Sequence, residues 1–104
     1  MRLTADAPRD LEDIAEWIAQ HDAPARARHV LERIEAAIEA LAAYPARGAH
    51  PKELLEIGMR EYRETFFKPY RIIYRIAGKR VYVYLIADGR RDMQTLLARR
   101  LLGA

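Results

Sequence analysis

Residues 70–86 read Tyr-Arg-Ile-Ile-Tyr-Arg-Ile-Ala-Gly-Lys-Arg-Val-Tyr-Val-Tyr-Leu-Ile, and this stretch decides the fold. Aromatic and β-branched residues recur at every second position from 70 to 76, which is the period of a β-strand with two different faces. The Ala-Gly-Lys-Arg segment at 77–80 predicts a turn, so the two halves form a β-hairpin. The second half, 81–86, is nearly all apolar or aromatic, which predicts the central and most buried strand.

Another strand is predicted immediately before this hairpin. Residues 59–66 have the same two-residue period, and Phe67-Lys68-Pro69 supplies a turn. Three consecutive strands joined by short turns predict an antiparallel meander. Residues 1–5 are expected to add a short edge strand to the same sheet.

Two helices are predicted ahead of the sheet. Apolar residues recur at i, i+3, i+4 and i+7 over 11–18, behind an N-cap at Asp6, and a second apolar stripe covers 27–41. The break between the stripes is short, so the helices are expected to form an antiparallel hairpin. Residues 45–58 are expected to be a loop with one helical turn, and 93–102 a short C-terminal helix.

The predicted fold class is α+β, with the helical hairpin packed on a small antiparallel β-sheet in one domain over residues 1–104. The predicted order is β-α-α-β-β-β with the short C-terminal helix last. The sheet face opposite the helical hairpin is expected to stay partly open, with strand arginines projecting from it.

The charge of the chain is divided between its two halves. Residues 1–58 hold 7 Lys/Arg and 11 Asp/Glu, whereas residues 59–104 hold 11 and 4. The basic half is rich in arginine, whose planar guanidinium suits two-point contact with phosphate or carboxylate. The chain has no cysteine, no apolar run long enough to span a membrane and no signal peptide pattern, so a cytoplasmic protein with no membrane association is expected.

Several short motifs in a fixed order resemble the RelE/ParE toxin superfamily. They are Asp-Leu-Glu-Asp-Ile-Ala-Glu-Trp-Ile at 10–18, Ile-Glu-Ala-Leu at 38–41, Gly-Met-Arg at 58–60, Pro-Tyr-Arg-Ile-Ile-Tyr-Arg-Ile at 69–76 and Gly-Arg-Arg-Asp at 89–92. The resemblance covers nearly the whole chain. It implies a toxin of a type II toxin–antitoxin module and the same fold as the pattern predicts. RelE-like members cut messenger RNA in the ribosome, whereas ParE-like members poison DNA gyrase.

The residues at the RelE-like catalytic positions argue against RNA cleavage, which needs a base, an acid and cations for the phosphate. The family's lysine positions fall at about Tyr62 and Glu64, and its tyrosine position at about Leu97. Arg71 and Arg91 match its arginine positions. If the chain were a ribonuclease, Arg71, Arg91 and Tyr62 would be its candidate catalytic residues.

The ParE-like alternative needs no catalytic group and is the leading hypothesis. Its candidate target-binding residues are arginines of the basic half: Arg60, Arg71, Arg75, Arg90 and Arg91. A structural alternative is that the arginines at 60, 71 and 75 pair across strands with Glu61, Glu64 or Asp92, and that Arg91 pairs with Asp92. The strand tyrosines alternate, so packing in the sheet explains them better than stacking on nucleobases.

The expected partners follow from the resemblance: a cognate antitoxin and DNA gyrase, with the ribosome and mRNA as the alternative. The antitoxin is expected to wrap the toxin in a hetero-oligomer, with acidic residues on the arginine-bearing face and apolar anchors between the helical hairpin and the sheet, or as an added strand at a sheet edge. The three histidines are scattered without ligand spacing and are expected at the surface. No metal and no cofactor is expected.

Overall fold

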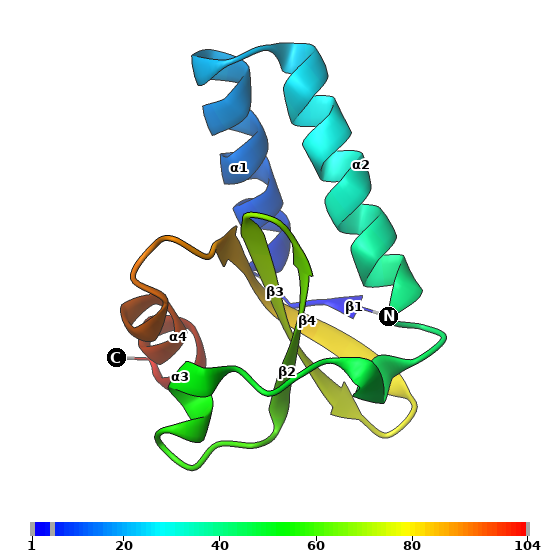
Figure 1. Cartoon of the computed structure of the whole chain (residues 1–104), viewed down its shortest axis with the longest axis vertical. Helices are drawn as coiled ribbons and strands as arrows, with labels where there is room; N and C mark the ends of the chain where they lie inside the picture. The colour runs from blue at the N-terminus through cyan, green and yellow to red at the C-terminus, as the bar shows by residue number, and fades with distance from the viewer. Residues whose placement is uncertain (1, 5, 104) are drawn as a thin grey trace.

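The computed structural model describes residues 2–4 and 6–103, and Figure 1 shows two helices standing over a small sheet with two shorter helices beside it. The helices and strands follow in the order β1 (Arg2–Leu3), α1 (Ala7–His21), α2 (Pro24–Ala40), a 3₁₀ turn η1 (Pro45–Arg47), α3 (Lys52–Leu55), β2 (Tyr62–Phe67), β3 (Tyr70–Ala77), β4 (Arg80–Asp88) and α4 (Met93–Leu102). The predicted fold class and element order are confirmed. Residues 1 and 5 of the expected first strand lie outside the described residues.

The sheet has the strand order β1-β4-β3-β2. β2, β3 and β4 form the predicted antiparallel meander, and β1 pairs in parallel with β4. β4 therefore lies in the interior of the sheet, as its apolar sequence predicts. β2 begins at Tyr62 rather than at Met59, because the Met59 N–H donates to the Leu54 carbonyl at 2.9 Å and still belongs to the end of α3.

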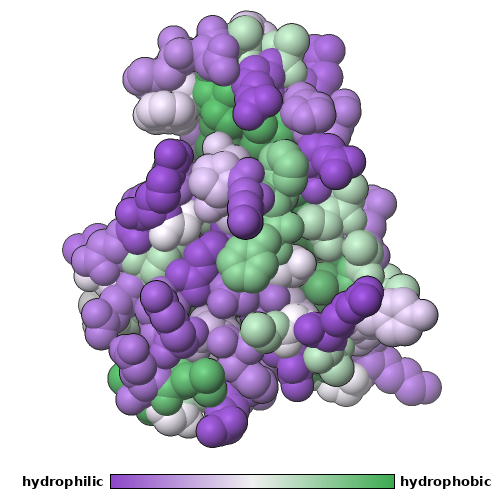
Figure 2. All heavy atoms as spheres, viewed as in Figure 1, coloured by the Kyte–Doolittle hydropathy of each residue, from purple (hydrophilic) through white to green (hydrophobic). Residues whose placement is uncertain are grey.

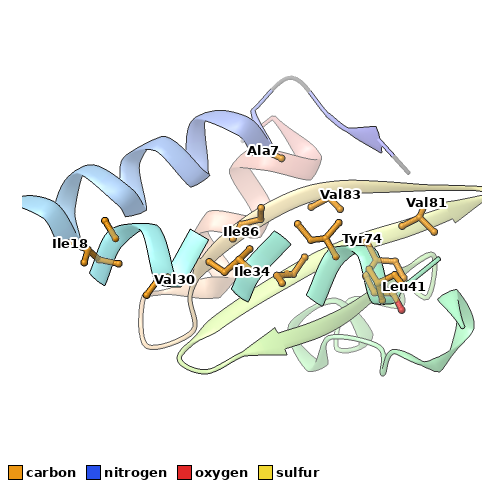
Figure 3. Close-up of a cluster of buried hydrophobic side chains, with 12 residues drawn as sticks. Ala7, Ile18, Val30, Ile34, Leu41, Tyr74, Val81, Val83 and Ile86 are labelled. Atoms are coloured by element: carbon orange, nitrogen blue, oxygen red, sulfur yellow. The ribbon is translucent and has the colours of Figure 1, made fainter. Parts of the chain in front are cut away.

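The main core lies between the helical hairpin and one face of the sheet. Ile34 and Ile38 of α2 pack there with Ile72, Tyr74 and other buried residues of β3 and β4 (Figure 3). These strand residues are spaced by two, and the helix residues by four, so each element buries one face. Close packing of this cluster fixes the hairpin over the sheet.

The opposite face of the sheet, which was expected to stay partly open, is covered in part by α3 and α4. Leu54 of α3 and Leu97 of α4 pack on Ile73 and Leu85 in a second cluster. A β-bulge contributes to this arrangement, because Ile73 pairs with Leu85 and Tyr74 with Val83, which leaves one extra residue on β4. The covered part lies toward the end of β4, and the end of the sheet at the β3–β4 turn remains exposed.

The loop after α2 is tied to the sheet by the buried hydroxyl of Tyr74. That hydroxyl donates to the Pro45 carbonyl at 2.5 Å and accepts from the Gly48 N–H at 3.1 Å. A Cβ at Gly48 would lie 2.2 Å from the Tyr74 hydroxyl and 2.6 Å from the Glu64 carbonyl, so only glycine fits there. The loop then pairs with β2 through the Glu64 N–H and the Ala49 carbonyl at 2.8 Å.

Candidate functional site

Arg71 lies between two carboxylates on the face of the sheet that α3 covers. Its Nη1 and Nη2 donate to the two carboxylate oxygens of Glu53 at 2.8 Å each, and its Nε donates to Glu64 Oε1 at 2.7 Å. All three side chains are nearly buried, with 12% of Arg71, 14% of Glu53 and 9% of Glu64 exposed. The guanidinium is therefore engaged on every nitrogen within the protein.

The ion pairs of Arg71 join three elements. Its hydrogen bonds hold the pKa of Glu53 below its usual value, against the opposing effect of burial. Pairing with Glu64 is one of the alternatives left open by the sequence. Glu53 is the partner that the sequence did not reveal, since it lies in the short helix α3, eighteen residues before Arg71.

Gly89 of the Gly-Arg-Arg-Asp motif lies against the stem of Arg71. A Cβ at this position would lie 2.8 Å from Arg71 Cδ, and the Gly89 N–H donates to the Pro69 carbonyl at 2.8 Å. The glycine therefore allows the turn after β4 to close over Arg71. This contact explains why a glycine stands at position 89 of the motif.

The turn after β4 presents two arginines that differ in their contacts. Arg90 Nε donates to Asp88 Oδ1 at 2.9 Å, and this pair lowers the pKa of Asp88. Arg91 is exposed, and within the described part of the chain its side chain makes no ion pair or hydrogen bond. Asp92 instead caps α4, accepting from the Thr95 N–H at 3.1 Å, so the Arg91–Asp92 pair considered from sequence does not form.

Arg60 and Arg75 are exposed at the end of the sheet near the β3–β4 turn. Within residues 2–4 and 6–103, neither guanidinium makes an ion pair. The five predicted target-binding arginines thus form no single cluster. Arg71 is internal, and the other four are exposed in two groups, one at each end of the meander.

The positions that a RelE-like ribonuclease would use for proton transfer hold residues that are poorly suited to transfer a proton. Leu97 is 1% exposed and belongs to the second core cluster. Tyr62 is buried, and burial raises the pKa of its phenol, which keeps it protonated at neutral pH. His21 and His29 are exposed as expected, whereas His50 is half-buried with its Nδ1 3.0 Å from the Tyr62 carbonyl oxygen.

A cleft of about 450 Å³ lies between α1 and the ends of β3 and β4. Ile14, Trp17 and Tyr70 form its apolar part, with Asp13 on the helix side and Arg91 on the side of the turn. Trp17 is 60% exposed and stacks on His21 with the ring centroids 4.2 Å apart. Figure 2 shows hydrophobic surface running between the two long helices toward the sheet, flanked by hydrophilic side chains.

One ion pair that the sequence did not reveal connects the first and last helices. Arg100 of α4 donates to both carboxylate oxygens of Asp10 on α1 at 2.8 and 2.9 Å, and also to the Tyr84 carbonyl at 2.7 Å. Asp10 in turn accepts from the Ile86 N–H at 3.0 Å. The two side chains thereby bind the Ile86 N–H and the Tyr84 carbonyl, which lie on the edge of β4 beyond the short strand β1.

The fold, a helical hairpin packed on a small antiparallel sheet, is the fold that the resemblance to the RelE/ParE superfamily implies. The family model described as "ParE toxin of type II toxin-antitoxin system, parDE" matches residues 1–93, and the chain belongs to this family. It is similar in fold to a solved structure titled "Chromosomal ParDE TA system from P. aeruginosa", with a TM-score of 0.70 and 19% identity over 84% of this chain and 91% of that chain. No curated protein matches the sequence. Within the described residues, no helix is both long and apolar enough for a membrane span.

Proposed function

We propose that this ParE-family toxin inhibits DNA gyrase in the cytoplasm by binding it, without catalysis of its own, and that a cognate antitoxin neutralises it. The observation that carries the proposal is the match to the ParE toxin family over residues 1–93. The exposed arginines at 60, 75, 90 and 91 are the candidate residues for binding the target. Arg71 has a positioning role, because Glu53 and Glu64 occupy its guanidinium.

The geometry disfavours the alternative, a ribosome-dependent ribonuclease. A phosphate approaching Arg71 would meet two carboxylates already bound to it, which adds repulsion where a cleavage site needs attraction. Tyr62 is held protonated by burial and cannot act as a base at neutral pH. The arrangement therefore suits binding better than cleavage.

The antitoxin is proposed to place an apolar anchor in the cleft beside Trp17. An exposed tryptophan with Ile14 and Tyr70 around it is the type of surface at which a few residues dominate binding energy. Arg91 at the rim of the cleft would bind an acidic residue next to the anchor. This arrangement supports a toxin–antitoxin hetero-oligomer.

Expression of the chain without an antitoxin tests the target. Inhibition of gyrase predicts growth arrest with filamentation and induction of the DNA-damage response. Rapid loss of translation with cleaved transcripts would instead overturn the gyrase proposal. Normal growth at high levels of folded chain would also contradict it.

Arg91→Ala tests whether the exposed arginines bind the target. The side chain is exposed and has no partner within the described residues, so the variant is expected to keep its thermal stability and lose toxicity. Arg28→Ala is the matched control, since it removes the same charge from an exposed position on α2. Equal toxicity of the two variants would remove Arg91 from the target-binding surface.

A further inference from the structure

A row of aromatic and cationic side chains crosses the sheet at its exposed end. Tyr62 of β2 pairs with Arg75 of β3, and Arg75 pairs with Tyr82 of β4. Residues that are direct partners across strands share a face, so the three side chains lie side by side. Neighbouring strands are about 4.8 Å apart, and the row therefore spans about 10 Å.

More positive charge lies next to this row, toward the β3–β4 turn. Ala77 lies on the same face as Arg75 because strand side chains alternate, and it pairs with Arg80, which places Arg80 on that face as well. Lys79 follows Gly78 at the tip of the turn, and Arg60 lies two residues before Tyr62. We call Arg75, Arg80 and Tyr82 the sheet-end platform.

The sheet-end platform is accessible to a partner. Arg75 and Arg80 are exposed, and Tyr82 and its neighbour Tyr84 are half-buried. Next to the platform, the rings of Tyr84 and Tyr62 pack edge to face with their centroids 5.3 Å apart. α3 and α4 pack on Ile73, Leu85 and Ala87 in a cluster that includes the buried Tyr62, whereas Arg75 and Arg80 remain exposed.

The charge of this end of the sheet is one-sided. Arg60, Arg75, Lys79 and Arg80 lie there, and the neighbouring Glu61 accepts a hydrogen bond from the Arg60 N–H at 3.1 Å. Unlike Arg71, whose three nitrogens all bind carboxylates, Arg75 makes no ion pair within the described residues. Guanidinium groups beside a half-buried aromatic ring suit a single nucleic-acid strand, because guanidinium groups bind phosphates and an aromatic ring can stack on a base.

We propose that the sheet-end platform binds single-stranded nucleic acid without sequence preference. Arg75 and Arg80 would contact phosphates and the ring of Tyr82 would stack on a base. An acidic protein segment could use the cations but would gain little from the aromatic ring, which is why the observations favour nucleic acid. The site goes beyond the proposed inhibition of gyrase and does not depend on it.

Fluorescence anisotropy of labelled oligonucleotides tests the proposal on the full chain in the absence of gyrase. The probes are oligothymidylate and oligouridylate of about twelve nucleotides. Comparing their affinities distinguishes binding of DNA from binding of RNA. Two phosphate contacts, one from Arg75 and one from Arg80, predict a log–log salt slope of about −1.4 for a single strand, so affinity falls about 7-fold from about 50 mM to about 200 mM salt. A duplex of the same length is expected to bind more weakly because its bases cannot stack on Tyr82.

Variants of the platform separate the two contributions. Arg75→Ala is expected to weaken binding about five-fold and to reduce the salt slope by about 0.7, the contribution of one phosphate. Tyr82→Leu is expected to weaken binding about ten-fold with the slope unchanged, since stacking carries no charge. Arg28→Ala, near the start of α2, is the control and is expected to bind as the unmodified chain does. Figure 1 shows the start of α2 at the α1–α2 connection, away from the sheet.

Four results would overturn the proposal. They are no binding to either probe at about 50 mM salt, equal binding of the duplex, unchanged binding by Tyr82→Leu, or an equal loss in Arg28→Ala. Polyglutamate competing as well as the oligonucleotides would assign the surface to an acidic protein instead. Circular dichroism melts that match the unmodified chain establish that Arg75→Ala and Tyr82→Leu are folded.

Discussion

Replacing Arg71 with leucine should destabilise the fold strongly, although the sequence predicted this arginine to bind the target. The substitution leaves Glu53 and Glu64 facing each other with 14% and 9% of their side chains exposed. Breaking a buried ion pair by removing one partner costs roughly 3–5 kcal/mol. Because both carboxylates lie near the surface and can regain some water, we expect about 3 kcal/mol. For a domain of this size, that corresponds to a fall of about 12–24 °C in the melting temperature.

Thermal and urea unfolding measure this effect, with Arg75→Leu as the matched control. Arg75 is on the same strand and face, but it is exposed and should change stability by no more than about 0.5 kcal/mol. Adding Glu53→Gln and Glu64→Gln to Arg71→Leu should recover much of the loss, because no unpaired charge then remains. Equal stability of the two leucine variants would refute the structural role of Arg71.

The pH dependence of stability gives an independent check of the same network. The pKa of Glu53 is lowered in the folded state by Arg71, so its contribution is fully present above the unfolded value of about 4.5. That contribution is lost as the pH falls through the lower folded value. In Arg71→Leu this acid-side loss should be absent, because the group that lowers the pKa is gone. An acid-unfolding profile parallel to that of the unmodified chain would contradict the assignment.

Three further outcomes follow from the contacts. Tyr74→Phe should lower the free energy of unfolding by about 1.5 kcal/mol, because the Pro45 carbonyl loses its buried donor; no change in urea unfolding would contradict that bond. Arg100→Leu should lower it by about 3 kcal/mol by leaving Asp10 without its cation, and a melt unchanged from that of the unmodified chain would count against the ion pair. Trp17, the only tryptophan, should shift its emission to shorter wavelength when the antitoxin binds, and Trp17→Ala should weaken that binding by about 2 kcal/mol; an unchanged emission maximum would place the antitoxin elsewhere.

The fold could be predicted from the sequence because its local patterns agree with one another. The alternation in 70–76, the apolar run in 81–86 and the stripes of the two long helices each fix which face is buried. The sequence did not reveal which elements cover part of the second sheet face, although the apolar side of the last helix was recognised. A helix of ten residues can pack on several surfaces, and only tertiary contacts decide that Leu97 meets Ile73 and Leu85.

The candidate site was less predictable than the fold. Sequence position cannot tell an arginine that faces solvent from one held by a distant carboxylate, which is why Arg71 and Arg75 looked equivalent. The partner Glu53 lies in the four-residue helix α3, which is too short to show a periodic pattern, and Asp10 and Arg100 are ninety residues apart. Long-range ion pairs depend on how elements are placed in space, and the local pattern carries no signal for them.

An assay of purified DNA gyrase most directly tests the central claim that this chain binds its target and does not cleave RNA. The unmodified chain, Arg91→Ala and Arg28→Ala are added to a supercoiling reaction, and the same proteins are added to ribosomes translating a defined mRNA. We predict inhibition of supercoiling by the unmodified chain and by Arg28→Ala, weaker inhibition by Arg91→Ala, and intact mRNA throughout. Cleaved mRNA with unimpaired supercoiling would contradict the account.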